Sequence, residues 1–217
     1  MGDVWAVVVA AGSGSRFGGS KQYELLLGRA VLEWSLTTAG AVCDGVVAVI
    51  PVADVGRRPL PVTRPPDAVV GGGATRSASV RNGLAAVPAD AEIVVIHDAA
   101  RPLAAPGLWA AAVTAVRRGA DAALCAVPVT DTIKRVDGVD VIDTVPRDRL
   151  VAVQTPQAFN AAVLRAAHAG GTDATDDGAL VEAAGGRVVV VPGSPTNLKI
   201  THPHDLAVAA ALAALPG

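Results

Sequence analysis

Residues 4–21 read VWAVVVAAGSGSRFGGSK, in which an unbroken apolar run passes into a loop of glycine, alanine and serine with two cations. The apolar run is short and rich in valine, which predicts a buried β-strand. Small residues after a strand let backbone N–H groups approach an anion closely, and Gly12 and Gly14 can adopt positive φ. Arg16 and Lys21 both suit oxyanions, the first as a planar fork and the second as a compact charge. The stretch therefore predicts a strand and a phosphate-binding loop, to which we expect the next helix to add the positive end of its dipole.

The spacing of this loop does not by itself select one nucleotide fold. Phe17 stands where the third glycine of a dinucleotide-binding motif belongs, and no GKS or GKT of a Walker loop follows. An ordinary strand-to-helix turn with two solvated cations is the alternative. Among the 18 basic residues only Lys21, Lys134 and Lys199 are lysines. A chain that otherwise uses arginine favours lysine where a compact cation matters, and the alternative is that these are chance surface residues.

Further apolar runs recur along the chain, with alanine-rich stretches of helical spacing between them. The predicted strands are Val4–Ala10, Val46–Pro51, Ile93–Ile96, Ala122–Val127, Val151–Gln154 and Arg187–Val191. The predicted helices are Ala30–Ala39, Ser77–Ala86, Pro106–Arg118, Asn160–Ala169 and Asp176–Ala184. The alternation predicts an α/β fold with a largely parallel sheet, formed by residues 1–217 as one domain. The proline-rich region Val52–Pro66 is predicted to be a loop between strands.

One segment departs from this alternation. Residues 128–145 read PVTDTIKRVDGVDVIDTV, and Asp137-Gly138 separates two runs that alternate polar with apolar residues. This pattern predicts a β-hairpin, which we take as a protruding arm over about residues 129–148. A two-stranded ribbon is only marginally stable alone in water, so a second subunit is a plausible cover for the apolar residues of the arm. These residues are Ile133, Val139, Val141 and Val145.

The composition excludes several classes of protein. A formal net charge of −2 gives no basic field for polymeric nucleic acid, and the apolar run Leu206–Leu215 is too short to span a bilayer. Asp3 stands where a signal peptide would carry positive charge. Cys43 and Cys125 lie far apart and neither has a basic neighbour, which supports neither a disulfide, a metal pair nor a nucleophilic thiol. We therefore expect a cytoplasmic protein that binds neither nucleic acid nor membrane.

Two further motifs carry polar side chains suited to a site. The stretch 71–79, GGGATRSAS, leads into a helix and could place Arg76 and Ser79 against a ribose, base or phosphate, although a plain loop with a serine cap fits it too. The strand Ile93–Ile96 is followed by His97 and Asp98, at the sheet edge where α/β enzymes place ligands. Asp98 suits Mg²⁺ held partly by phosphate oxygens. Its alternatives are capping the following turn or pairing with Arg101.

The histidines do not indicate a metal site. His202 and His204 lie at a predicted helix start bracketed by Thr201 and Asp205, with Pro203 in the first turn and no third ligand nearby. We interpret His97 and His168 as structural residues.

Taken in order, the motifs resemble the 2-C-methyl-D-erythritol 4-phosphate cytidylyltransferases of the non-mevalonate isoprenoid pathway nearly from end to end. They are AAGSGSR, SKQY, GGATRSAS, HDAARP, PVTDTIK, TVPR, TPQAF, TDDGAL and NLKIT. The resemblance implies a Rossmann-like, GT-A-like three-layer sandwich and a homodimer clasped by the arm. It also implies Mg²⁺-dependent transfer of CMP from CTP onto methylerythritol 4-phosphate. Related readings are a ribitol 5-phosphate cytidylyltransferase, a sugar-1-phosphate nucleotidyltransferase and a non-catalytic nucleotide-binding homologue.

The same resemblance implies a role for individual residues. The catalytic residues would be Arg16, Lys21, Arg147 and Lys199. The CTP-binding residues would be Ala10, Ala11, Gly12, Ser13, Gly14, Gly73, Ser79, Asp98 and Ala99, with Asp98 as the metal ligand. The methylerythritol phosphate site would comprise Arg101, Thr132, Arg147 and Thr175. Two positions depart from the family pattern: Arg16 and Lys21 are closer in sequence than is usual, and Ala74 replaces an acidic residue that many members have.

Overall fold

The central sheet has seven strands and a mostly parallel arrangement. The computed structural model describes residues 3–57, 60, 62 and 65–215. The strands of the sheet are β1 (Val4–Val9), β4 (Gly45–Ile50), β5 (Ala68–Gly71), β6 (Ile93–Asp98), β7 (Ala122–Pro128), β10 (Val151–Asn160) and β11 (Val188–Pro192). They lie in the order β11-β7-β10-β6-β1-β4-β5, and only β10 runs antiparallel to its neighbours. The α/β fold with a largely parallel sheet is thus confirmed.

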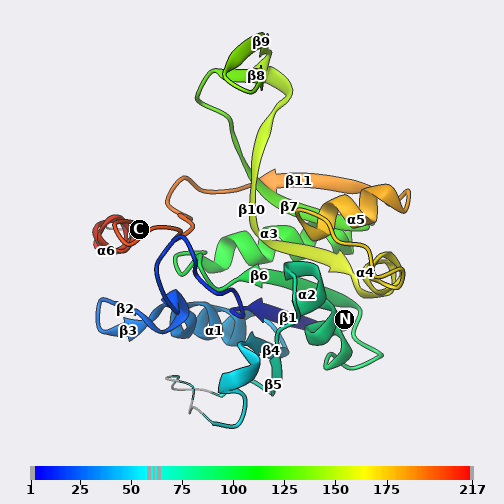
Figure 1. The fold of residues 1–217 in the computed structure, drawn as a ribbon. Helices are drawn as coiled ribbons and strands as arrows, with labels where there is room; N and C mark the ends of the chain where they lie inside the picture. The colour runs from blue at the N-terminus through cyan, green and yellow to red at the C-terminus, as the bar shows by residue number, and fades with distance from the viewer. Residues whose placement is uncertain (1–2, 58–59, 61, 63–64, 216–217) are drawn as a thin grey trace.

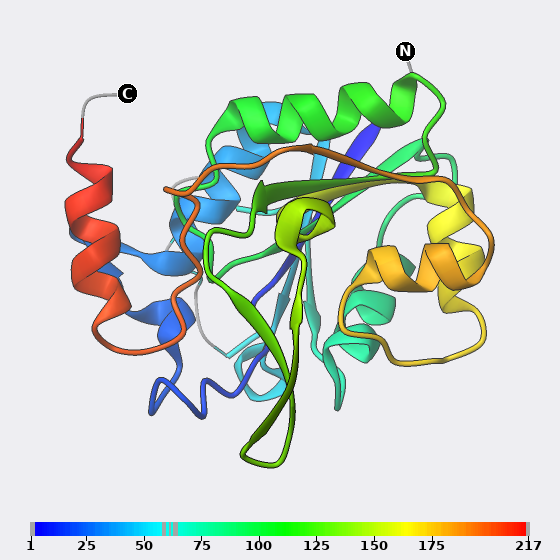
Figure 2. The ribbon, with the colours of Figure 1, turned by 90° about the horizontal axis from the view of Figure 1, so that it is seen from above.

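Helices cover both faces of this sheet (Figures 1 and 2). The helices are α1 (Val31–Val42), α2 (Arg76–Ala85), α3 (Pro106–Arg117), α4 (Ala161–His168), α5 (Asp177–Ala183) and α6 (Asp205–Ala213). In β1, Ala6 and Val8 belong to the apolar cluster with α1 and α3, whereas Val7 belongs to the cluster with α2, α4 and α5. Because successive side chains of a strand point to opposite faces, the valine-rich run of β1 is buried on both sides. Among the described residues, no helix has the length and apolar character needed to cross a membrane.

Two strands differ from the sequence prediction. The strand predicted over Val151–Gln154 continues through Pro156 to Asn160, and its pairing with β7 shifts register between Val153 and Gln157. Proline cannot donate a ladder hydrogen bond, so the pattern wrongly ended the strand there. The short edge strand β5 was missed because its residues are only partly buried and follow the proline-rich region. Of that predicted loop, Val52–Asp54 forms the 3₁₀ helix η2, and residues 58, 59, 61, 63 and 64 lie outside the described residues.

The helix predicted over Ala30–Ala39 is present as α1, but it does not follow the first loop directly. Residues 21–30 form a 3₁₀ helix η1 (Lys21–Tyr23) and a small hairpin of β2 (Leu25–Leu26) and β3 (Arg29–Ala30), and α1 begins only at Val31. Leu27 and Gly28 make the hairpin turn with φ of 51° and 80°, as a two-residue turn between strands requires. A small hairpin therefore lies between the first loop and the amino-terminal end of α1.

The predicted arm is present as an antiparallel hairpin. Strand β8 (Ile133–Asp137) pairs with β9 (Asp140–Val145), and Gly138 in the turn has φ of 57°. The hairpin projects away from the sheet in Figure 1, and Val139 at its tip is 95% exposed. The arm therefore buries little apolar surface against the rest of the described chain.

The structural reading of two histidines is consistent with their surroundings. His97 is fully buried, with its ring nitrogens 3.2 Å from Thr155 Oγ1 and 3.2 Å from the Arg101 carbonyl oxygen. Burial lowers the pKa of His97 to about 4, although Asp98 acts in the opposite direction. His168 Nε2 lies 3.0 Å from Asp177 Oδ1.

The low pKa of His97 predicts a pH-dependent stability. Below about pH 6.5 the unfolded chain protonates this side chain while the folded protein does not, so the free energy of unfolding falls as pH is lowered toward 4. We expect His97 to account for about 2–3 kcal/mol of the loss measured by urea unfolding between about pH 7 and pH 4. A His97→Gln variant should lose less than the parent over this range, whereas His202→Gln, at an exposed position, should match the parent. Equal losses of unfolding free energy in all three proteins would contradict the assignment of this pH dependence to His97.

Candidate active site

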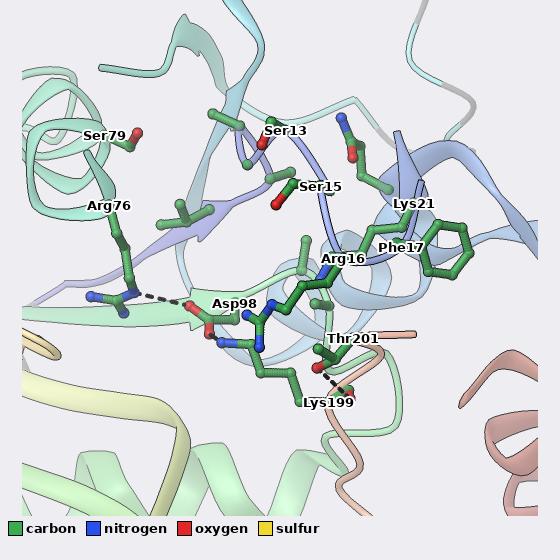
Figure 3. A pocket seen from close by; sticks show the side chains of 18 of the residues that line it. Ser13, Ser15, Arg16, Phe17, Lys21, Arg76, Ser79, Asp98, Lys199 and Thr201 are labelled. Atoms are coloured by element: carbon green, nitrogen blue, oxygen red, sulfur yellow. Dashed lines mark hydrogen bonds and ion pairs between the residues drawn. The ribbon is translucent and has the colours of Figure 1, made fainter. Parts of the chain in front are cut away.

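A cleft of about 560 Å³ opens above the carboxyl ends of β1 and β6 (Figure 3). The two strands are adjacent and parallel, and Val9 pairs with Asp98 in register, so the segments that follow them meet at one sheet edge. Most of the predicted catalytic and CTP-binding residues lie here. Those that line the cleft are Ala10, Ala11, Gly12, Ser13, Gly14, Arg16, Lys21, Gly73, Ser79, Asp98, Ala99 and Lys199.

The first loop is shaped by one glycine and one aromatic residue. Gly14 has φ of 65°, its carbonyl oxygen accepts from the amides of Phe17 and Gly18, and a Cβ here would lie 1.9 Å from the Gly19 oxygen. Gly14 therefore meets the prediction of positive φ, but Gly12 does not. The Phe17 side chain packs against the small apolar cluster that contains Ile200. This contact joins the first loop to the segment that carries Lys199.

Three cations gather on one side of the cleft. Lys21 Nζ donates to the Ile200 carbonyl oxygen at 2.7 Å, and Arg16 and Lys199 lie beside it in Figure 3. Burial lowers the pKa of Lys21, and the charges of Lys199 and Arg16 lower it further. Among the described residues that line the cleft, Asp98 is the one carboxylate. The excess of positive charge makes this side of the cleft suited to an anion.

Two of the three lysines lie where the scarcity of lysine suggested, at a site for an anion. Lys21 and Lys199 line the cleft, but Lys134 lies on the arm and donates to Thr144 Oγ1. The scarcity of lysine therefore helps to locate the cleft, but it does not show that every lysine of the chain belongs to it.

Asp98 is held by two cations from distant parts of the chain. Its Oδ2 accepts from Lys199 Nζ at 2.6 Å and its Oδ1 from Arg76 Nε at 3.3 Å. Burial alone would raise the pKa of Asp98, but Arg76 and Lys199 outweigh it and hold the pKa well below its usual range. The alternative pairing with Arg101 is not what the structure has, because Arg101 Nη1 donates instead to the Asn197 carbonyl oxygen. Asp98 is thus an ionised carboxylate at the floor of the cleft.

The donor set fits Mg²⁺ only if a nucleotide brings most of the ligands. Among the described residues, no three histidine, cysteine or acidic side chains come together to hold a metal ion. Mg²⁺ in nucleotide sites is commonly bound by one or two carboxylates, phosphate oxygens and water. Asp98, ionised and facing the cleft, can supply that one carboxylate. His202 and His204 stack on each other at 5.5 Å and lie outside the cleft lining.

The β5–α2 turn forms the opposite wall. Thr75 caps α2 by accepting from the Ala78 amide at 3.0 Å, so the cap is a threonine and not the predicted serine. Ser79 Oγ accepts from the Gly73 amide at 3.1 Å and donates to the Thr75 oxygen at 2.9 Å. A Cβ at Gly73 would lie 2.4 Å from that of Ala78, so the backbone here requires glycine. The residues of the turn that line the cleft, Gly73, Ala74 and Thr75, are small, and Arg76 at the start of α2 lines it too.

The four residues expected to bind the second substrate do not line this cleft. Thr132 and Arg147 lie on the arm, and Arg147 donates to the Thr130 carbonyl oxygen within it. Thr175 is exposed in the loop before α5, and Arg101 lies beneath the segment that carries Lys199. The chain, as described, brings the residues predicted to bind the nucleotide together but leaves these four outside that cleft.

Sequence reasoning missed the partners of two site residues. Arg76 was considered only as a donor to a ligand, yet it joins Asp98 to Asp177, whose carboxylate lies 2.7 Å from Arg76 Nη1. The available signal was Asp177 within TDDGAL, a second carboxylate after the capping Asp176. Phe17 was noted only as a departure from a glycine motif.

Comparison with known proteins places these features in one family. A family model described as IspD, 2-C-methyl-D-erythritol 4-phosphate cytidylyltransferase, matches residues 4–214. Proteins of that name from Rhodococcus opacus and Rubrobacter xylanophilus are 46% and 42% identical, over 97% and 99% of this chain and 95% and 96% of theirs. The crystal structure of the enzyme of that name from Thermus thermophilus superposes with a TM-score of 0.82 at 37% identity, covering 99% of this chain and 100% of that one. A bifunctional IspD/IspF enzyme of Solidesulfovibrio magneticus is 45% identical over 98% of this chain, which spans 58% of that relative's length.

Proposed function

The chain belongs to the 2-C-methyl-D-erythritol 4-phosphate cytidylyltransferase family, and we propose that it transfers CMP from CTP to 2-C-methyl-D-erythritol 4-phosphate. The products are 4-diphosphocytidyl-2-C-methyl-D-erythritol and pyrophosphate, within non-mevalonate isoprenoid biosynthesis. The observation that carries the proposal is the grouping of Arg16, Lys21 and Lys199 beside the ionised Asp98 in one cleft. Such a grouping suits a polyphosphate with its metal ion.

The proposed chemistry needs no general base. The second pKa of a phosphate monoester is about 6, so the acceptor phosphate is largely dianionic at neutral pH and can attack directly. One of its oxygens bonds to the α-phosphorus of CTP, and the bond from that phosphorus to the bridging oxygen breaks to release pyrophosphate. Catalysis is then a matter of alignment and charge stabilisation. In our proposal Arg16 and Lys21 stabilise the triphosphate charge, while Lys199 and Arg147 orient the acceptor phosphate.

The remaining cleft residues are proposed to bind the nucleotide. Their small side chains support this role, because they let CTP approach the main chain. They are Ala10, Ala11, Gly12, Ser13, Gly14, Gly73, Ser79 and Ala99. Asp98 would hold Mg²⁺, which when bound would neutralise phosphate charge as a Lewis acid.

We further propose a homodimer in which the arm of one protomer completes the cleft of the other. The exposed apolar residues of the arm support this, as does the position of Thr132 and Arg147 outside the cleft of their own protomer. With Arg101 and Thr175 they would form the site for methylerythritol 4-phosphate. The single-domain organisation and the cytoplasmic location stay predictions.

The direct test is a pyrophosphate-release assay. With Mg²⁺, CTP and methylerythritol 4-phosphate we expect steady release, and the rate should fall at least ~10²-fold when the acceptor is omitted, because alignment of a bound nucleophile supplies most of the acceleration. Ribitol 5-phosphate in place of the acceptor is the matched control and should give little turnover. Turnover with ribitol 5-phosphate alone would replace the proposed substrate, and CTP binding without turnover on either would indicate a non-catalytic homologue.

A further inference from the structure

We infer that Arg76 is a positioning residue that fixes the carboxylate of Asp98 and ties it to the start of α5, an inference that rests on the proposed nucleotidyl transfer. Its guanidinium joins two carboxylates: Nε lies 3.3 Å from Asp98 Oδ1 and Nη1 lies 2.7 Å from Asp177 Oδ2. Figure 3 shows the side chain reaching from α2 toward Asp98 along the wall of the cleft. Arg76 thus connects the one carboxylate of the cleft lining to the interior of the protein.

Asp177 provides a rigid anchor for this connection. Its side chain is fully buried, and its second oxygen lies 3.0 Å from Nε2 of the buried His168. A buried carboxylate is stable only when it is paired and hydrogen-bonded, so Arg76 and His168 hold Asp177 and are held by it. The far end of the guanidinium is therefore fixed, and its near end fixes Asp98.

Local helix preference does not explain an arginine at this position. Arg76 is the first residue of α2, where the helix dipole disfavours a cation. Burial would lower the pKa of Arg76, but Asp98 and Asp177 outweigh it and raise the pKa. A residue that contradicts local preference yet satisfies two carboxylates has the pattern of a site residue.

The start of α2 is hydrogen-bonded to the loop before α5, which carries Thr175. Thr75 Oγ1 donates to Asp173 Oδ1 at 2.8 Å, and Ser77 Oγ accepts from the Ala174 amide at 3.2 Å. Arg76 is thus placed between the carboxylate proposed for the metal–nucleotide side and the loop proposed for the acceptor side. An error in the angle of Asp98 would misalign the two substrates, and this affects the rate more than it affects nucleotide affinity.

An Arg76→Lys variant tests whether the positioning of Asp98 requires the shape of arginine or only its positive charge. Lysine keeps the positive charge but has one nitrogen, which cannot contact Asp98 and Asp177 with the fork geometry of arginine. We expect Arg76→Lys to lower kcat by about 10- to 100-fold while KM for CTP changes less than about threefold. Arg165→Lys is the matched control, because Arg165 also contacts several oxygens, the carbonyls of residues 87–89, and lies outside the cleft lining. Calorimetric binding of CTP with Mg²⁺ should be nearly unchanged in both variants.

The outcomes separate this inference from the proposed function. If the parent protein binds and turns over CTP while Arg76→Lys has the same kcat as Arg165→Lys, Arg76 is not a positioning residue. If the parent neither binds nor turns over CTP, the proposed function fails instead. A crystal structure of the parent with CTP and Mg²⁺ decides the matter even if the lysine variant does not fold. Arg76 must still contact Asp98 and Asp177 there, and a guanidinium moved onto a phosphate would overturn the inference.

Discussion

Replacing Lys199 with alanine should lower kcat for CMP transfer by about 10²–10³-fold, the usual cost of removing one preorganised charge from a transition state. Lys199 Nζ lies 2.6 Å from Asp98 Oδ2 and close to Arg16 and Lys21, so it belongs to the charge array that the reaction needs. Steady-state pyrophosphate release at saturating CTP and acceptor measures the effect. The variant should remain folded, because the Lys199 side chain is 40% exposed and Asp98 keeps Arg76.

Lys199→Arg is the companion variant for this prediction. It keeps the charge but replaces a compact ammonium with a larger planar group, so we expect an intermediate loss of about tenfold. Thermal unfolding of both variants should stay close to that of the parent. A Lys199→Ala protein that keeps more than about a tenth of the parent rate would remove Lys199 from the catalytic residues.

How far the sequence predicts this molecule depends on the range of the interactions involved. Strands β1, β4 and β6 were predicted because each is a continuous apolar run buried on both faces, and the Asp137-Gly138 turn marks the arm for a local reason too. Strand β10 was predicted too short because a proline such as Pro156 is not expected within a strand. The full length of β10 is set by its pairing with β6 and β7. Features set by neighbouring residues can be predicted from the sequence, whereas the pairing of strands that are distant in sequence cannot.

The same limit applies within the cleft. The loop glycines and Asp98 could be selected because each lies at or just after the end of a strand and shows its chemistry directly. The partners of Asp98 could not, since Arg76 and Lys199 come from distant segments and meet only when the sheet is assembled. The next helix, whose dipole was expected to add to the first loop, is α1, and it begins only at Val31. The Leu27–Gly28 turn builds a hairpin between the first loop and this helix, and the cations of the cleft supply positive charge.

The proposed sharing of the site between protomers predicts a recovery of activity from two inactive variants. Arg16→Ala and Arg147→Ala homodimers should each lose about 10²–10³-fold in kcat. In a heterodimer purified through two different affinity tags, one cleft has both defects, and the other has its own Arg16 together with an intact Arg147 from the partner. We expect this heterodimer to recover about half of the parent activity, as two-fold symmetry with one working site requires.

Two further heterodimers make this result specific to the arm. Arg16 and Lys199 line the same cleft of one protomer, so a heterodimer of Arg16→Ala with Lys199→Ala carries one defect in each cleft and should stay inactive. A heterodimer of a parent protomer with one that carries both Arg16→Ala and Arg147→Ala should also be inactive. The one cleft of this heterodimer that has Arg16 belongs to the parent protomer, and it receives the arm that lacks Arg147. If Arg147 acted within its own protomer, that pair would keep about half of the activity and the first heterodimer would have none. The two pairs thus give opposite results for the two arrangements, and only a partner's arm in the cleft accounts for recovery in the first.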